Sequence, residues 1–339
     1  MISIVIPTLN SGRTLDACLA SIRAQDFPRD QVEVVIADAG STDDTLDIAR
    51  CHAVDCIVPN PLKTGEAGKS AGITASHGDL IALVDSDNVL PDTAWLRRMT
   101  APFADPEIMG AEPLEYTWRP QDPALTRYFA LLGMNDPLCL FLGNYDRFCG
   151  VTGRWTAWPI AQEDRGDYLK LTLDVARLPT IGANGFVFRR TVLEHVTWTP
   201  YFFDIDVVHQ SVAAGFTHVA KVKTGIVHLF CDRLGLFARK QRRRIHDFLH
   251  FNQSRQRTYP WRAQSRFAIV QFALATATVV PLLIQMLRGM SRRRDAAWWY
   301  HVPVCWVTLW VYGTATLGQM LGRKAEALDR ADWQKAAKP

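Results

Sequence analysis

The segment Leu80-Ile81-Ala82-Leu83-Val84-Asp85-Ser86-Asp87 changes from an apolar run to two carboxylates within eight positions. The apolar run is typical of a buried strand, so the acidic pair lies where that strand ends. A strand terminus that stops alternating can direct both carboxylates into one cleft. Such oxygen ligands suit Mg²⁺ or Mn²⁺, ions that typically bridge a diphosphate. A simple acidic turn is the alternative, because Asp is common in turns.

Apolar strands alternate with amphipathic helices on both sides of this segment. Strands are predicted at residues 2–6, 32–37, 57–58 and 80–84, and helices at about 11–25, 41–50 and 65–76. This alternation predicts an α/β fold with a parallel, right-handed sheet. Ligands of such sheets gather at the carboxyl ends of the strands. The acidic loop Asp38-Ala39-Gly40-Ser41-Thr42-Asp43 follows the second long strand and is expected at that same edge.

The pattern loosens between residues 100 and 180, where Pro, Trp and Tyr are frequent, and sheet extension with long loops is expected there. A turn into a strand is predicted at 182–188 and a helix at about 204–215, ended by Gly215. Residues 235–251 are predicted to form a basic amphipathic helix in a membrane interface.

The net charge of +4 hides an acidic front and a basic rear. Residues 1–230 hold 19 Lys+Arg against 28 Asp+Glu, whereas residues 231–339 hold 19 against 6. The basic rear also contains the most apolar segments, so its charge favours a membrane surface over nucleic acid. Seven Cys without a CxxC pair argue against a disulfide scaffold or a zinc ribbon.

Two uncharged stretches, at residues 267–287 and 296–321, reach membrane-spanning length. Trp298, Trp299 and Tyr300 near the start of the second are typical of a membrane interface. We therefore expect two membrane helices; buried core helices and re-entrant or in-plane helices are the alternatives. More Arg and Lys flank the pair than lie in its loop, which favours a cytoplasmic front. The opening residues are too short and uncharged to be a secretory signal.

Further candidate residues lie at strand ends and in a glycine-bearing loop. Asp38 could accept from the N–H groups of a nucleobase, and Lys63, Gly65, Gly68 and Lys69 offer positive charge and close backbone approach to phosphates. His228 ends another apolar strand and is a candidate metal ligand, with a structural histidine as the alternative. The absence of GxGxxG and GxxxxGK[ST] argues against dinucleotide oxidoreductases and phosphate-loop NTPases.

Four motifs in order resemble the inverting glycosyltransferases of family 2: Ile6-Pro7-Thr8-Leu9-Asn10, Ala37-Asp38-Ala39-Gly40-Ser41-Thr42-Asp43, Ala71-Gly72-Ile73 and Asp85-Ser86-Asp87. The resemblance implies an A-type glycosyltransferase fold, a Rossmann-like mixed sheet that binds a UDP- or GDP-sugar with Mn²⁺ or Mg²⁺. It also implies roles for single residues. Pro7, Thr8, Asn10 and Asp38 would border the donor nucleoside, with Lys69 where Arg is frequent. Asp85 and Asp87 would hold nucleotide and metal. Ala39 and Ser70 depart from the commoner Asp and Asn.

The resemblance extends to a second acidic motif. Phe203-Asp204-Ile205-Asp206 precedes Ala214-Gly215-Phe216 at the family's interval, so Asp204 matches the catalytic base and Phe203 replaces a Glu. Asp206 would support it, and Asn184 with Gly185 resembles the acceptor-side loop. Gln241-Arg242-Arg243-Arg244-Ile245 is similar to the Gln-x-x-Arg-Trp motif of processive synthases, with Ile245 in place of Trp. Contact of Arg242, Arg243 and Arg244 with lipid head groups is the preferred interpretation.

These observations predict a membrane-attached inverting glycosyltransferase that transfers a sugar to a hydroxyl or phosphate of a lipid-linked acceptor at the cytoplasmic membrane. The predicted catalytic domain covers residues 1–230, with a nucleotide-binding region at about 1–100 and an acceptor region at about 101–230. A basic segment at 231–265, two membrane helices at 266–322 and a tail at 323–339 are predicted to follow. A processive polysaccharide synthase, a nucleotidyltransferase and a non-catalytic membrane scaffold are the alternatives. The sugar, the acceptor and the oligomeric state stay open.

Overall fold

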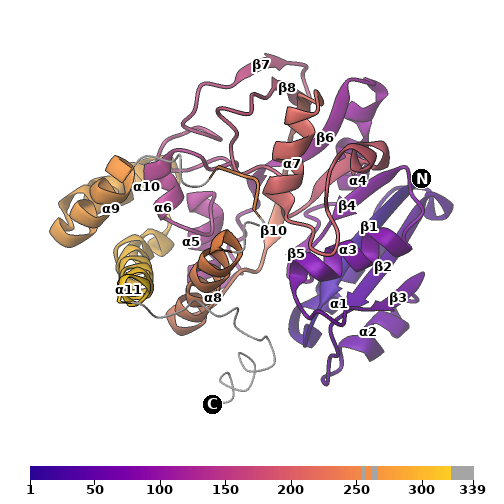
Figure 1. The fold of residues 1–339 in the computed structure, drawn as a ribbon, viewed down its shortest axis with the longest axis horizontal. Coiled ribbons are helices and arrows are strands. Elements are labelled where there is room, and N and C mark those ends of the chain that lie inside the picture. The colour runs from indigo at the N-terminus through magenta and orange to yellow at the C-terminus, as the bar shows by residue number, and fades with distance from the viewer. Residues whose placement is uncertain (254–256, 261–265, 322–339) are drawn as a thin grey trace. The chain divides into compact units, whose positions relative to one another are not determined.

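The computed structural model describes residues 1–253, 257–260 and 266–321. The chain divides into two units, whose elements are labelled in Figure 1. Residues 1–117 and 158–229 form the first, called here the sheet unit; residues 118–157 and those from 230 onward form the second, the helical unit. The predicted boundaries kept residues 1–230 together, whereas the structure groups 118–157 with the later helices. The predicted tail at 323–339 lies outside the described residues.

A mixed sheet forms the centre of the sheet unit. Its order is β3-β2-β1-β4-β9-β6-β10-β8-β7, with β5 paired to β10. The strands are β1 Ile2–Thr8, β2 Val32–Asp38, β3 Cys56–Pro59, β4 Leu80–Leu83, β5 Asn88–Val89, β6 Ile108–Tyr116, β7 Ala161–Asp164, β8 Tyr168–Thr172, β9 Phe186–Arg189 and β10 His218–His228.

The first four long strands confirm the predicted alternation. β1 pairs in parallel with β2 and β4, and β2 pairs in parallel with β3. Ile4, Val5 and Ile6 are completely buried, as expected for a strand covered on both faces. Thr8 lies opposite Asp38 in the register, so the carboxyl ends of β1 and β2 are neighbours.

Beyond β4 the sheet is mixed, which confirms the Rossmann-like mixed sheet that the family resemblance implied. β9 runs antiparallel to both β4 and β6, and β8 runs antiparallel to β10 and β7. An apolar run indicates that a strand is buried, but it does not indicate whether the strand runs parallel or antiparallel to its neighbours. A strand is buried equally well in both directions. The loosely patterned stretch at 100–180 supplies β6, β7 and β8.

The helices of the sheet unit lie close to the predicted positions. They are α1 Gly12–Arg23, α2 Thr45–Cys51, α3 Gly65–Ala75, α4 Trp95–Thr100 and α7 Asp204–Ala213, with 3-10 turns at Arg29–Gln31, Ala101–Ala104 and Arg190–His195. α3 packs on β1, β2 and β3. Gly215 has φ +99°, the left-handed conformation expected of a glycine that follows a helix.

The helical unit is built around aromatic side chains. Its elements are α5 Ala124–Leu132, α6 Leu138–Leu142, α8 Leu234–Gln253, α9 Arg266–Thr278, α10 Val280–Arg292, a 3-10 turn Ala296–Tyr300 and α11 His301–Met320. Tyr128, Phe129 and Trp298 lie in one buried cluster. The buried hydroxyl of Tyr128 has a polar partner in this unit, since it lies 2.8 Å from His301 Nδ1.

The first of the two predicted membrane helices does not form as a single helix. The first breaks at Val279, where φ is +64°, and α9 and α10 meet at a bend of 91°. Pro281 supplies a reason, because proline has no N–H to donate and disfavours a helical residue before it. The second stretch starts with a 3-10 turn before α11. Among the described residues no single helix has both the length and the apolar character to span a membrane. The bent pair of α9 and α10, taken together, has the length and apolar composition of a span.

Candidate active site

Thr8 and Asp38 meet at the carboxyl ends of β1 and β2. The Thr8 hydroxyl donates to Asp38 Oδ1 at 2.9 Å. Asp38 Oδ2 accepts from the N–H groups of Gly40 and Ser41, each at 2.9 Å. The buried carboxylate of Asp38 thus shapes the loop that follows β2. Its contact with a nucleobase stays a prediction.

Asn10 joins the loop after β1 to the loop after β2. Its φ is +48°, a conformation that Asn adopts more readily than most residues. The Asn10 N–H donates to Ser41 Oγ, and Asn10 Oδ1 accepts from the Thr42 N–H, both at 2.8 Å. A Cβ at Gly68 would lie 2.8 Å from Pro7 Cβ, so glycine permits α3 to approach the end of β1. The predicted donor-side residues therefore lie at one edge of the sheet.

Asp85 and Asp87 leave β4 in a turn closed by Asn88. Asn88 Oδ1 accepts from the Asp85 N–H at 2.9 Å. The two carboxylates then take different partners: Asp85 Oδ1 lies 3.8 Å from Lys69 Nζ, and Asp87 Oδ1 lies 3.4 Å from His228 Nε2. The three predicted metal ligands do not form one group; across the residues that the structure describes, no three His, Cys, Asp or Glu side chains are placed to hold a metal.

Lys69 connects the acidic turn to α7. Its Nζ donates to Asp204 Oδ2 at 2.6 Å, and the Lys69 side chain is only 8% exposed. Burial alone would lower the pKa of Lys69, but the carboxylates of Asp204 and Asp85 outweigh it and hold that pKa above its ordinary value. Lys69 was predicted to contact the donor; the structure brings it to the base candidate.

Asp204 lies in the first turn of α7, with one carboxylate oxygen held and the other unengaged. Oδ1 is buried and has no hydrogen-bond partner within the described residues. Burial raises the pKa of Asp204 to about 6, against the opposing charge of Lys69. The Phe202 N–H donates to the Glu66 carbonyl at 2.9 Å, which fastens the start of α7 to α3. A fixed carboxylate with a free oxygen and a pKa near neutrality suits a general base.

The loop 182–185 is held from several sides. Asn184 Nδ2 donates to the Tyr116 hydroxyl at 3.1 Å, and Asn184 Oδ1 accepts from Asn88 Nδ2 at 3.2 Å. The Gly185 N–H donates to the Leu83 carbonyl at 2.7 Å. Asn184 and Gly185 are buried, as is Asp206 in α7. The residues predicted to face an acceptor therefore support the site from beneath its surface.

A buried ion pair below this loop was not predicted from the sequence. Lys221 Nζ on β10 donates to Glu112 Oε2 on β6, and both side chains are completely buried. Glu112 Oε1 accepts from the Gly182 N–H at 3.0 Å. Gly182 in turn abuts α7, because a Cβ there would lie 2.9 Å from the Asp204 carbonyl oxygen. The available signal was a pair of charged residues inside each of two largely apolar strands, Glu112 and Glu115 in β6 and Lys221 and Lys223 in β10.

The arginines predicted to contact lipid or phosphate lie on α8 in the helical unit. Arg242 is exposed, and Arg243 Nε lies 3.9 Å from Asp247 Oδ2. Arg244 donates to the Asn135 carbonyl at 3.2 Å and to Gln241 Oε1 at 2.8 Å. Arg244 thus ties α8 to the 135–136 loop of its own unit.

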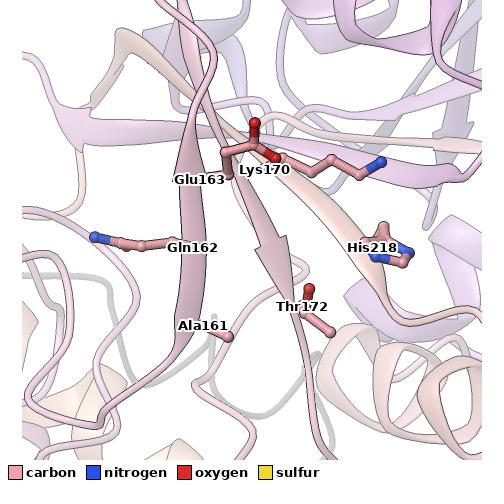
Figure 2. A pocket seen from close by; sticks show the side chains of 6 residues that line it. All are labelled: Ala161, Gln162, Glu163, Lys170, Thr172 and His218. Carbon is pink, nitrogen blue, oxygen red and sulfur yellow. The ribbon is translucent and has the colours of Figure 1, made fainter.

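An open pocket of about 310 Å³ lies elsewhere in the sheet unit. It is lined by Ala161, Gln162, Glu163, Lys170, Thr172 and His218, which lie on β7, β8 and β10 (Figure 2). Lys170 Nζ donates to Asp105 Oδ2 at 2.8 Å. None of the predicted site residues lines this pocket, so it is separate from the candidate site.

The strands that carry the site match a known protein family. Residues 3–130 match the family model described as Glycosyl transferase family 2. This part of the chain is similar to a family 2 glycosyltransferase domain. This match covers β1 to β6, including the Thr8, Asp38, Lys69 and Asp85 positions, while Asp204 and His228 lie beyond it.

Two curated relatives are similar to this chain over limited stretches of sequence. Glycosyltransferase AglE of Haloferax volcanii is 26% identical over 140 residues, which is 39% of this chain and 45% of that protein. A PGL/p-HBAD biosynthesis glycosyltransferase of Mycobacterium bovis is 36% identical over 109 residues, which is 30% of this chain and 41% of that protein. The matches thus span less than half the length of these glycosyltransferases.

One solved structure has a similar fold along most of the chain. It is the mannosyltransferase PcManGT from Pyrobaculum calidifontis in complex with GDP-Man and Mn²⁺. The likeness covers 93% of this chain and 86% of that chain, with a TM-score of 0.53 and 16% identity. At this identity the likeness establishes the glycosyltransferase fold alone.

Proposed function

We propose that the protein is an inverting glycosyltransferase that uses a nucleotide-diphosphate sugar as donor. The proposal rests most directly on Asp204, whose Oδ2 is anchored by Lys69 while its Oδ1 is unengaged. This arrangement lies next to Asp85, at the edge where the region similar to family 2 presents its strand ends.

In the proposed reaction, Asp204 Oδ1 takes the proton of an acceptor hydroxyl as the acceptor oxygen forms a bond to the anomeric carbon. The bond from that carbon to the diphosphate breaks on the opposite face, and the nucleoside diphosphate leaves with the electron pair. Where the acceptor is a phosphate, its oxygen attacks in the same way. Lys69 keeps Asp204 in place and favours its ionised form.

Asp87 and His228 fit a divalent cation as a carboxylate oxygen and an imidazole nitrogen 3.4 Å apart. Mg²⁺ and Mn²⁺ sites of this kind use few protein ligands and complete their shell with water and substrate phosphate. We propose that these two residues hold Mn²⁺ or Mg²⁺. Such an ion would stabilise the charge on the departing diphosphate. PcManGT, whose structure contains Mn²⁺ with GDP-Man, is consistent with that choice.

We propose a lipid-linked hydroxyl or phosphate as the acceptor, used at the cytoplasmic face of a membrane. The support is the composition of the helical unit, where α9, α10 and α11 carry exposed apolar side chains next to arginines.

The test is a product analysis on the purified full chain with labelled nucleotide sugars, Mn²⁺ and a lipid extract. Release of nucleoside diphosphate, together with a labelled lipid of inverted anomeric configuration, is expected. Release of pyrophosphate would instead indicate nucleotidyl transfer, and long product chains would indicate a processive synthase. No turnover with any donor would favour a scaffold.

A further inference from the structure

Exposed apolar side chains concentrate at the end of the described chain. Of 18 large hydrophobic residues that are exposed in the described residues, 14 lie between residues 267 and 321. Scattered exposed apolar residues are normal on a soluble surface, but a concentration of them marks an interaction site. We call Val280, Leu283, Ile284 and Leu287 of α10, with Trp306 and Trp310 of α11, the outer face.

The spacing shows that the outer face follows single sides of its helices. Val280, Leu283, Ile284 and Leu287 stand at intervals of three and four, which place them along one stripe of α10. Trp306 and Trp310 are one turn apart on α11 and are 44% and 70% exposed. A helix on a soluble surface would have polar residues at these positions.

The inner sides of the same helices already have a core. Leu282 of α10, Phe272 of α9 and Cys305 of α11 belong to one buried cluster. A Cβ at Gly289 would lie 2.5 Å from Trp298, so α10 packs closely on its inner side. The outer face is therefore a second apolar surface and not the interior of an incompletely packed bundle.

The charges around the outer face select its partner. Residues 266–321 contain five arginines, and their one acidic residue, Asp295, accepts from Arg127 Nε at 2.9 Å. Arg288 and Arg294 are exposed. An apolar stripe that is followed by exposed arginines in the sequence, with exposed Trp on the next helix, matches the acyl boundary and the phosphates of an anionic membrane.

We propose that the outer face binds an anionic lipid bilayer, with the stripe of α10 inserted at the acyl boundary and Arg288 at the phosphates. A second copy of the chain would also cover apolar residues, but it would repeat the same positive charge opposite itself. Membrane binding of this kind is independent of the proposed chemistry and would bring the enzyme to a lipid-linked acceptor.

The test is flotation of the purified full chain with phosphatidylcholine vesicles, with and without phosphatidylglycerol. The Leu283→Ser/Leu287→Ser variant should bind about tenfold more weakly to both. The Ile57→Ser/Leu62→Ser variant, which changes two exposed apolar residues of the sheet unit, should bind like the native chain. Arg288→Gln should weaken binding about fivefold on phosphatidylglycerol vesicles only.

Circular dichroism and a thermal melt establish that each variant is folded. Equal flotation of the two double variants would overturn the proposal. Unchanged flotation of the Leu283→Ser/Leu287→Ser variant, with conversion of a dimer to a monomer in sedimentation velocity, would assign the outer face to a second copy. Transfer to a lipid acceptor is measured separately, so failure of the chemistry and failure of membrane binding are distinguishable.

Discussion

Lys69 Nζ lies 2.6 Å from Asp204 Oδ2, although 135 positions separate the two residues. The contact joins α3, which packs on β1 and β2, to the first turn of α7. It keeps one oxygen of the base candidate fixed and leaves the other unengaged. The first consequence concerns the dependence of activity on pH.

Activity should rise with pH through about 6, because the pKa of Asp204 is raised to about 6 and only the ionised form can take a proton. Lys69→Met removes the charge that opposes burial, so the pKa of Asp204 should rise further and the acidic limb should move to higher pH. The pH profile of kcat/KM measures this. Lys69→Arg should restore most of the profile, and Lys223→Met, at a surface lysine that pairs with Asp164, should leave it unchanged. An acidic limb that does not move in Lys69→Met would contradict the assignment.

Because Asp87 lies beside His228, we expect the affinity for the metal ion to depend on Asp87 more than on Asp85. Asp87→Asn or His228→Gln should raise the Mn²⁺ concentration needed for half-maximal activity by about tenfold or more. Asp85→Asn should change it less, because Asp85 lies toward Lys69. A Mn²⁺ titration at saturating donor tests this, and equal shifts in the Asp85 and Asp87 variants would refute the division of roles.

The Glu112–Lys221 pair predicts a separation of stability from catalysis. Glu112→Leu leaves the buried Lys221 charge unpaired and should cost about 3–5 kcal/mol of unfolding free energy. Glu112→Leu/Lys221→Met should recover most of that stability. Because Gly182 loses its acceptor in both variants, kcat should stay low in the double variant. Urea unfolding and kcat are measured side by side; recovery of both together would mean that the pair is only structural.

Gly182 offers a sharper test of how the loop positions Asp204. Gly182→Ala forces a Cβ toward the Asp204 carbonyl oxygen, and φ is +133° there. A displacement of the base should lower kcat about tenfold to a hundredfold. Gly166→Ala is the matched control, since Gly166 also has a positive φ but has no atom within 4 Å of the added Cβ. Similar losses of kcat in both variants would indicate backbone strain alone.

The strands that position the site could be predicted because burial leaves a pattern in the sequence. β1, β2 and β4 are apolar runs that end at Thr8, Asp38 and the Asp85 turn, and these residues do lie at one edge. Asp204 was found through a motif, and its position in the first turn of α7 is confirmed.

Other features depend on side-chain geometry that no pattern contains. Asp85 lies near Lys69 whereas Asp87 lies near His228, and Lys69 reaches Asp204 only in the folded chain. The break between α9 and α10 had a visible signal in Pro281, but the unbroken apolar composition of 267–287 favoured one helix. The pairing of Glu112 with Lys221 follows from the register of β6 and β10, which apolar patterns do not specify.

If Asp204 is the base of a glycosyltransferase, its replacement should separate sugar transfer from donor binding. Donor binding, followed by thermal shift with Mn²⁺, and sugar transfer are compared in Asp204→Asn and in Asp122→Asn, a buried aspartate of the helical unit that pairs with Arg119. We predict that Asp204→Asn keeps donor binding and loses transfer by about a hundredfold or more, whereas a folded Asp122→Asn retains transfer. Transfer by Asp204→Asn at the native rate would contradict the account.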